Sequence, residues 1–469
     1  MKNSMSFSVS NLRKWLATSP ILRWEKSRTL LLVTAAGTVM LAIAFVEKPH
    51  TSYVAHEWGT FTSVQGGDGV LLEWKPLESS RLPGFVYNWF KPGLGRQPIG
   101  PLAFTKAELL TLQRMETPVI YLYAAEPQSV DVTVKFPKGL ITEWYPQASR
   151  VGPSAAKPPW LTVRLDEYVV KSGLKPGFRF ASLASTTAAT PDSGIRWAGV
   201  NILSPADAMT SLAKDSSGSH YFAARNTDAN ILKAAVKSDN RGPEHERFLF
   251  YRGVGNFETP LRVRVADKDA LILENTESEP LTDLFVLRVE MGAGTFERVE
   301  SLSSGQPRVF PVNKPPGLGP LPRVSRELGK EMQRSLVKHG LYAREAEAMV
   351  ATWRDSWFEE DGVRVLYLLS RAWADRTLPL NLAPQPKELV RVMVGRAEVL
   401  LPSAERALAQ GLRSADSGGA QAHAELVQQL RSLNRFAEPA LRLATEGAPQ
   451  VLKEKGWELL HLATVSQGN

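Results

Sequence analysis

The sequence contains no cysteine in 469 residues, and this absence excludes several kinds of chemistry. Disulfide bonds, thiol nucleophiles, iron–sulfur clusters and zinc sites with cysteine ligands all require cysteine. A haem attached through a CxxCH motif is excluded for the same reason. The folded protein must therefore be stabilised without cross-links between cysteines.

Motifs of the common nucleotide and hydrolase sites are also absent. The chain has neither GxGxxG nor GxxxxGK[ST], which argues against nucleotide binding by those two modes. It has no HExxH or HxH metal motif and no GxSxG nucleophile elbow. Sites assembled from residues far apart in the sequence stay open.

Blocks of lysine and arginine are missing after residue 50. The formal net charge is +8, but residues 1–49 alone hold seven basic side chains against two acidic ones. Nucleic-acid binding requires a concentrated basic face. The rest of the chain has a nearly balanced, mixed charge, so no nucleic-acid partner is expected.

Residues 29–46, TLLLVTAAGTVMLAIAFV, form the one long uncharged apolar run. At about 1.5 Å per residue, a helix of this length just crosses a bilayer core. Basic side chains precede it, so residues 1–49 are predicted to be a cytoplasmic basic segment followed by a single-pass inner-membrane anchor. Residues 50–469 would then be periplasmic or extracellular. Ala42-Ile43-Ala44 also fits a signal-peptidase site, and cleavage there would give a secreted protein.

The sequence from residue 53 to about 310 is rich in short alternating runs punctuated by Gly and Pro, a pattern typical of β-sandwiches. In YVAHEWGTFTSVQGGDGVLLEW, two such runs flank GGDG, where glycines suit a tight turn. We expect a first β-rich unit over residues 50–175. An irregular insertion and a second β-rich unit follow over residues 176–310.

A Pro/Gly-rich segment, residues 311–323, is predicted to be a linker to a different kind of structure. Residues 324–469 should form a mixed α/β and then helical region, with HEAT-like hairpins that cap the preceding domain. Two apolar stripes at helical spacing support this prediction. They are Ala346, Met349, Val350, Trp353 and Trp357, and Leu426, Val427, Leu430, Leu433 and Phe436. The fold class expected is mainly β, with two sandwich-like units and a helical C-terminal region.

The HEWGT stretch places His56 and Glu57 next to each other. On a strand, successive side chains point to opposite faces, so His56 and Trp58 should share one face and Glu57 the other. A histidine near a carboxylate is a candidate general base or metal ligand, and the alternative is a structural histidine or glutamate whose hydrogen bonds are satisfied beside Trp58. The candidate catalytic residues are His56, Glu57, His245 and Glu246. The candidate ligands of a divalent metal are His56, His220 and His245, with surface or hydrogen-bonding roles as the alternative.

Tryptophan is frequent at the start of the β-rich region. Exposed aromatic rings stack on sugars and recur in protein interfaces, whereas buried rings fill sandwich cores. Both roles are open here. The candidate ligand-binding residues, for a glycan or an envelope protein, are Trp58, Trp74, Trp89 and Trp144.

The strings AHEWGTFTSV (residues 55–64), ETPVIYLY (116–123) and GLITEWYP (139–146) resemble those of a family of large secreted or membrane-anchored bacterial proteins that carry the HEWGT motif. GVRVLYLLSRAW and LVRVMVGRAEVL fit the same pattern, so the resemblance covers most of residues 50–405. It implies a bacterial envelope protein and assigns no activity.

The leading expectation is therefore a membrane-anchored extracytoplasmic recognition or scaffolding protein of the bacterial envelope. The alternative is a metal- or carboxylate-dependent hydrolase of envelope polymers. The alternative requires His56, Glu57, His220, His245 and Glu246 to converge within about 5 Å in the fold.

Overall fold

One long mixed β-sheet organises the part of the chain that the structure describes. The structure is a computed structural model, and it describes residues 53–75, 82–89, 91, 109–152, 161–164, 180–183, 193–204, 212–215, 218–234, 242–311 and 317–465. All of these residues belong to one compact unit. The predicted membrane segment lies outside them, and no helix within them is long and apolar enough to span a bilayer.

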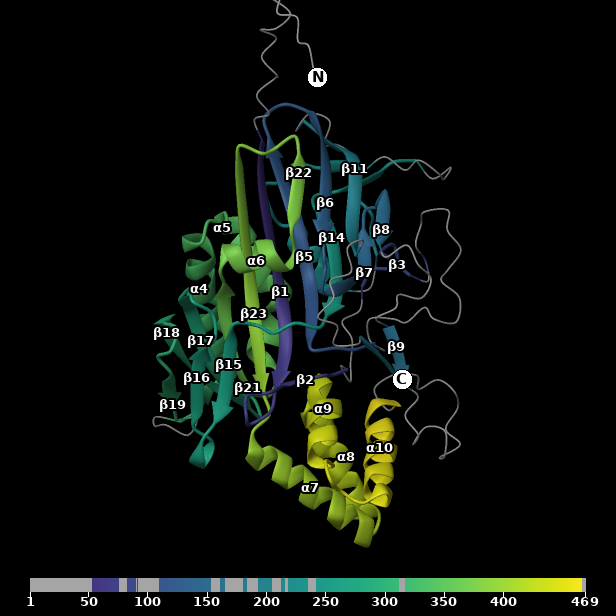
Figure 1. Ribbon diagram of the computed structural model, residues 1–469, viewed down its shortest axis with the longest axis vertical. Coiled ribbons are helices and arrows are strands. Elements are labelled where there is room, and N and C mark those ends of the chain that lie inside the picture. The colour runs from purple at the N-terminus through teal and green to yellow at the C-terminus, as the bar shows by residue number, and fades with distance from the viewer. Residues whose placement is uncertain are drawn as a thin grey trace, which may run out of the picture. The chain divides into compact units, whose positions relative to one another are not determined.

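The long sheet has eleven strands among the described residues (Figure 1). In order across the sheet they are β20 (Gly319–Pro320), β18 (Ala293–Leu302), β17 (Leu281–Glu290), β21 (Gly362–Leu369), β23 (Glu388–Val399), β1 (Tyr53–Gln65), β5 (Gln113–Ala124), β14 (Leu249–Gly255), β7 (Gly139–Tyr145) and β3 (Tyr87–Asn88), with β2 (Leu71–Leu72) paired to the end of β1. Only the β1–β23 pair is parallel among them.

The pairing of β1 with β23 corrects the predicted division into domains. The two strands pair over twelve positions, beginning with Val54 opposite Glu388. The sheet thus continues from the predicted first β unit (50–175) into the region predicted to be separate (324–469), and residues 311–323 do not divide two sheets. Alternation of apolar and polar residues identifies strands but not their distant partners.

Two smaller sheets lie against different parts of the long sheet and give the fold its sandwich-like character. The six-stranded sheet packs on the β5–β14 half of the long sheet, where the ring of Trp197 lies 6.3 Å from that of Tyr251. The three-stranded sheet is tied to β1 by the Gln65 amide, which donates to the Leu261 carbonyl at 3.0 Å and accepts from the Val263 N–H at 2.8 Å. The mainly β fold class is confirmed.

The strands of these sheets are as follows. The six-stranded sheet contains β13 (Glu244–Glu246), β12 (Leu232–Ala234), β11 (Gly194–Ile202), β6 (Gln128–Lys135), β22 (Leu380–Ala383) and β8 (Arg150–Gly152). The three-stranded sheet contains β15 (Leu261–Val265), β16 (Leu271–Asn275) and β19 (Arg308–Phe310). A further small sheet contains β4 (Leu109–Leu110), β10 (Phe180–Leu183) and β9 (Leu161–Arg164).

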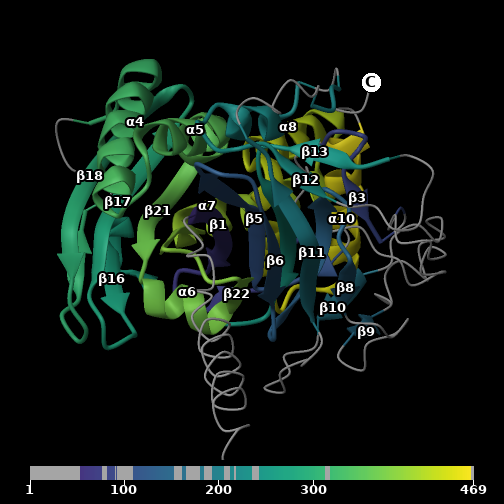
Figure 2. The same cartoon turned by 90° about the horizontal axis from the view of Figure 1, so that it is seen from above.

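Helices α4 (Leu321–Lys338) and α5 (Ala343–Arg354) cover one face of β17, β18 and β21, and β16 lies on the opposite face (Figure 2). A π-helical turn, η4 (Asp355–Glu359), extends α5. The apolar stripe predicted here is confirmed, since all five of its residues, from Ala346 to Trp357, are buried. The other short helices are η2 (His220–Arg225), η3 (Asp267–Asp269) and α6 (Arg371–Thr377).

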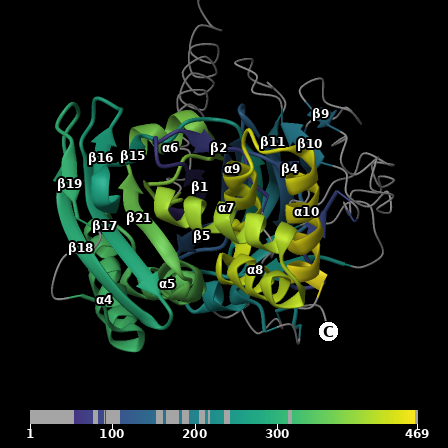
Figure 3. The same cartoon turned by 90° about the horizontal axis from the view of Figure 1, so that it is seen from below.

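The C-terminal helices are α7 (Pro402–Ser417), α8 (Ala420–Ser432), η5 (Asn434–Phe436), α9 (Ala437–Ala444) and α10 (Gln450–Val465), seen together in Figure 3. Their apolar core includes Leu412, Leu430 and Leu441, and it also takes in Val64 and Trp74 from the β-rich part. Of the second predicted stripe, Leu426, Leu430 and Phe436 are buried and Val427 and Leu433 are half-buried. These helices therefore share a core with the end of β1.

Candidate functional site

The two faces of β1 contact different parts of the fold. His56 bonds to Glu345 of α5, whereas Glu57 bonds to Arg391 of β23 and to Tyr251 of β14. The sequence prediction that His56 and Glu57 point to opposite faces is therefore confirmed. No metal ion can be shared by the two side chains.

His56 is fully buried beneath the start of α5. Its Nδ1 lies 2.7 Å from Oε2 of Glu345, and because a carboxylate only accepts, Nδ1–H is the donor. The hydroxyl of Tyr123 donates to the other oxygen at 2.7 Å, and the backbone N–H of Tyr342 donates to Oε2 at 2.8 Å. Burial, and then the charge of Glu345, raise the pKa of the Tyr123 hydroxyl. This arrangement joins α5 to β1 and β5.

Glu57 is the counterion of a buried arginine. Arg391 donates from Nε to Glu57 at 2.6 Å, from Nη1 to Asp375 at 2.7 Å and from Nη2 to the Leu378 carbonyl at 2.8 Å. Tyr251 donates its hydroxyl to the second oxygen of Glu57. A carboxylate held in this way has no open side for a substrate, so its geometry is that of a structural ion pair.

Glu246 and His245 also have separate surroundings. The buried carboxylate of Glu246 accepts from Arg225 Nη2 at 2.6 Å and from the Tyr221 hydroxyl at 2.9 Å. His245 is half-buried in β13, opposite Lys233 in the register, and burial followed by the Lys233 charge lowers its pKa. Glu246 thus closes an internal ion pair, and no bond joins it to His245.

The predicted metal site does not form among the described residues. His220 is exposed at the start of η2, with Nε2 3.6 Å from Asp355, while His56 and His245 lie in β1 and β13. In this part of the chain, no three His, Asp or Glu side chains are grouped so that they could hold a metal ion. The convergence on which the hydrolase alternative depended is therefore missing, because His56, Glu57, His220 and Glu246 each contact a different partner.

The four tryptophans predicted as a binding platform are buried instead. Trp58, Trp74 and Trp144 are fully buried and Trp89 is 7% exposed. Trp89 donates to the Ile141 carbonyl at 2.7 Å, and its ring packs edge-on against Trp144 at 5.9 Å. The prediction of an exposed role is wrong, because these rings are packed in apolar cores. Trp58, Trp89 and Trp144 belong to the core of the β-rich part, and Trp74 belongs to the core of the C-terminal helices.

A cluster of buried ion pairs, which was not predicted, lies where η4 and η5 meet the long sheet. It combines three guanidinium groups with three carboxylates: Arg364, Arg396 and Arg435, with Glu116, Glu360 and Glu398. Arg435 Nη1 lies 3.1 Å from Glu116 and Arg364 Nε lies 2.9 Å from Glu398. The available signal was arginine inside otherwise apolar strands, as in GVRVLYLL and LVRVMVGRAEV.

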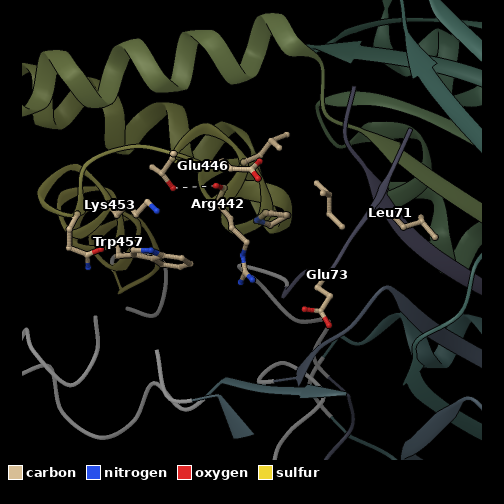
Figure 4. A pocket seen from close by; sticks show the side chains of 12 residues that line it. Leu71, Glu73, Arg442, Glu446, Lys453 and Trp457 are labelled. Carbon is tan, nitrogen blue, oxygen red and sulfur yellow. Dashed lines mark hydrogen bonds between the residues drawn. The ribbon is translucent and has the colours of Figure 1, made fainter. Parts of the chain in front are cut away.

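A cavity of about 550 Å³ opens between β2 and the C-terminal helices (Figure 4). The β-rich part contributes Leu71, Leu72 and Glu73 to its wall. The helical part contributes Pro439, Arg442, Leu443, Thr445, Glu446, Gly447, Gln450, Lys453 and Trp457. The sequence carried no signal for this cavity, because its two walls come from opposite ends of the described chain.

The lining of the cavity combines apolar and charged groups. The side chains of Arg442, Lys453 and Trp457 reach toward it from the helices, with Glu73 across from them (Figure 4). Arg442 donates from Nη2 to Glu438, but its buried Nε has no acceptor among the described residues. A cavity of this size can hold a ligand, and six of its twelve lining residues are polar or charged.

Comparisons with known proteins assign no family. The sequence matches no protein family and no curated protein. Among solved structures, the chain is similar to the Fcho1 mu homology domain of Danio rerio with bound Eps15 peptide, with 9% identity and a TM-score of 0.25, covering 75% of this chain and 98% of that one. The yeast delta-COP-I mu-homology domain gives 8% identity and a TM-score of 0.25, covering 76% of this chain and 100% of that one. The complex of the yeast domain with the Dsl1 WxWxV peptide gives 8% identity and a TM-score of 0.22, covering 75% of this chain and 98% of that one. Likenesses this low carry no conclusion about function.

Proposed function

We propose that this protein is a recognition or scaffolding protein of the bacterial envelope, and that its ligand binds in the cavity between β2 and helices α9 and α10. The observation that carries the proposal is the lining of that cavity. Trp457 and the leucines supply apolar area, and Arg442 and Lys453 supply cations beside it. Such a combination anchors a partner by burial and orients it by charge.

The partner that suits this lining is a segment of an envelope protein. Both charge signs line the cavity, since Glu73 and Glu446 accompany Arg442 and Lys453. A peptide offers ammonium or guanidinium groups, carboxylates and apolar side chains together, so it can match both charge signs and the apolar wall at once. We propose a peptide ligand on this ground, with a glycan as the competing outcome.

The placement in the envelope rests on the N-terminal sequence and on the resemblance to HEWGT-carrying proteins. The uncharged run at residues 29–46 is proposed to hold the chain in the inner membrane as a single pass. The basic side chains before it favour a cytoplasmic N-terminus. The cavity would then face the periplasm or the exterior.

The test is site-specific photo-crosslinking of the full-length protein in its native membranes. A benzophenone side chain at Gln450, on the rim of the cavity, should give a defined adduct, and one at Met291, which is 86% exposed on the β17–β18 turn, should not. Adding Lys453→Glu should lower the yield of the Gln450 adduct roughly tenfold, because it reverses a charge in the cavity.

Lys455→Glu is the matched control, since Lys455 lies on the same helix but does not line the cavity. Digestion and mass spectrometry of the adduct distinguish a peptide from a glycan. The same adducts at Gln450 and Met291, or an adduct unaffected by Lys453→Glu, would refute the proposed site.

A further inference from the structure

Next to the cavity, arginines and aromatic rings pack together at the junction of the long sheet and η5. The guanidinium carbon of Arg396 lies 5.1 Å from the centre of the Phe436 ring, and that of Arg435 lies 5.3 Å from it. Trp74 completes the group, with its ring 5.4 Å from Phe436. Trp74 follows Glu73 of the cavity wall, and Phe436 directly precedes α9, which contributes Pro439 and Arg442 to that wall.

Arg396 has only one of its three guanidinium nitrogens in a hydrogen bond. Nη2 donates to Glu360 at 2.7 Å and to Glu398 at 3.0 Å. Nε and Nη1 are buried and have no acceptor in the described part of the chain, and the side chain is 0% exposed. Buried donors on a charged group are costly to leave unsatisfied, and each needs an explanation.

Two other buried groups of the strands and helical turn around Arg396 have no hydrogen-bond partner among the described residues. Thr62 of β1 pairs in register with Arg396, and Thr60 lies on the same face of β1 as Thr62. The buried hydroxyl of Thr60 has no partner among the described residues. The buried indole N–H of Trp357 also has no acceptor among the described residues. Trp357 adjoins the cluster, since Arg364 donates to the Trp357 carbonyl at 3.3 Å. The N–H groups of Arg396 and Trp357 can only donate, so this region holds buried donors that lack an acceptor among the described residues.

We propose that a small monovalent anion, chloride in physiological solution, binds beside Nε and Nη1 of Arg396 and ties η5 to the long sheet. Buried donors without a partner call for an acceptor, and donors from a guanidinium favour a charged one. The enclosed position favours a small ion over a phosphate or a carboxylate-bearing metabolite. This site is separate from the ligand cavity and does not depend on the function proposed for it.

The charges around Arg396 agree with this reading. Burial lowers the pKa of Arg396, and the positive charges of Arg435 and Arg364 lower it further, against the opposing effect of Glu360 and Glu398. A bound anion would counter the loss of hydration and the repulsion between the guanidinium groups.

The test compares anions at constant ionic strength, so that general screening is equal. The melting temperature of the full-length protein is measured in sodium gluconate with increasing sodium chloride or bromide. Chloride and bromide should raise it by about 2 °C at roughly 150 mM and the effect should saturate. Arg396→Met should abolish the rise, and Arg323→Met should keep it, because Arg323 is an exposed arginine on α4.

A second measurement decides the question if Arg396→Met does not fold. Crystals of the unaltered protein soaked in bromide should show an anomalous peak within about 3.5 Å of Nη1 of Arg396, a hydrogen-bond distance for a large anion. A water molecule at that place, or equal melting temperatures in chloride and gluconate, would overturn the proposal.

Discussion

At the scale of single residues, His56 and Glu57 serve two different parts of the fold although they are neighbours. His56 satisfies Glu345 at the start of α5, and Glu57 neutralises Arg391 next to it in the sheet. Each side chain is fully buried. Removal of one partner from such a pair leaves a buried charge or a buried donor unsatisfied, which costs more than the pair itself contributes.

Glu345→Ala should therefore destabilise the protein strongly. The change leaves the His56 Nδ1–H, the Tyr123 hydroxyl and the Tyr342 N–H without their shared acceptor. We expect the free energy of unfolding to fall by about 3 kcal/mol. Glu345→Gln, which keeps one acceptor oxygen, should cost about 1 kcal/mol. Equilibrium urea denaturation of the full-length protein measures both.

Glu347→Ala is the matched control, since Glu347 is an exposed glutamate two residues further along α5. It should change the free energy of unfolding by less than about 0.5 kcal/mol. Equal losses for Glu345→Ala and Glu347→Ala would show that the bonds to His56 and Tyr123 contribute nothing.

At the scale of elements, η4 and η5 are joined to the long sheet through charge rather than through apolar packing alone. Glu360, directly after η4, accepts from Arg396 of β23 and lies 3.5 Å from Arg435 of η5. Burial alone would raise the pKa of Glu360, but Arg435, Arg396 and Arg364 hold it below its ordinary value. The junction should therefore weaken in acid.

The direction of this pH dependence follows from the sign of the shift. A carboxyl whose pKa is lower in the folded state binds fewer protons there than in the unfolded chain. Its contribution to stability is complete above the ordinary pKa of about 4.3 and is lost as the pH falls through the lower folded value. Glu360→Gln should therefore reduce stability at pH 7 and make little difference near pH 2.

Urea denaturation of the unaltered protein and of Glu360→Gln, repeated from pH 7 to pH 2, measures this difference. Glu327→Gln is the control, because the pair that Glu327 forms with Arg323 on α4 is exposed. A loss of stability that stays constant from pH 7 to pH 2 would contradict the role given to the Glu360 charge.

The elements themselves were largely predictable, and their partners were not. The alternation in HEWGTFTSV placed His56 and Glu57 on opposite faces, and helical spacing placed Met349 and Trp353 on a buried stripe. Both are local patterns. Glu345, by contrast, is 289 positions from His56, and nothing local to either residue signals that they bond. The same holds for the cavity, whose walls combine Leu71 with Trp457.

Arginine within an apolar strand marks a buried ion pair in this fold. Arg364, Arg391 and Arg396 alternate with apolar residues as an exposed polar face would, yet all three are buried. Both faces of the long sheet are covered at these strands, so the polar positions need partners such as Glu398 and Glu57. Period-two alternation indicates two different faces, but not that one of them is solvent.

At the scale of the whole described unit, the parallel pairing of β1 with β23 joins the first described strand to the last one. β21 and β23 lie between β17 and β1, so the parts before and after residues 311–323 share one sheet and one apolar core. A break in the chain at that place would leave all of these contacts intact. We therefore expect a protein cut there to stay together.

The measurement uses a specific protease site placed at residues 312–316 of the full-length protein. After cleavage, the two fragments should elute together in size-exclusion chromatography in native buffer and separate only in denaturant. Two independent domains joined by a linker would instead separate or show two unfolding transitions, because few contacts cross a domain boundary. Co-elution with a single transition would follow from strand β23 holding the C-terminal part in place, since withdrawal of β23 would leave β1 and β21 unpaired on one side.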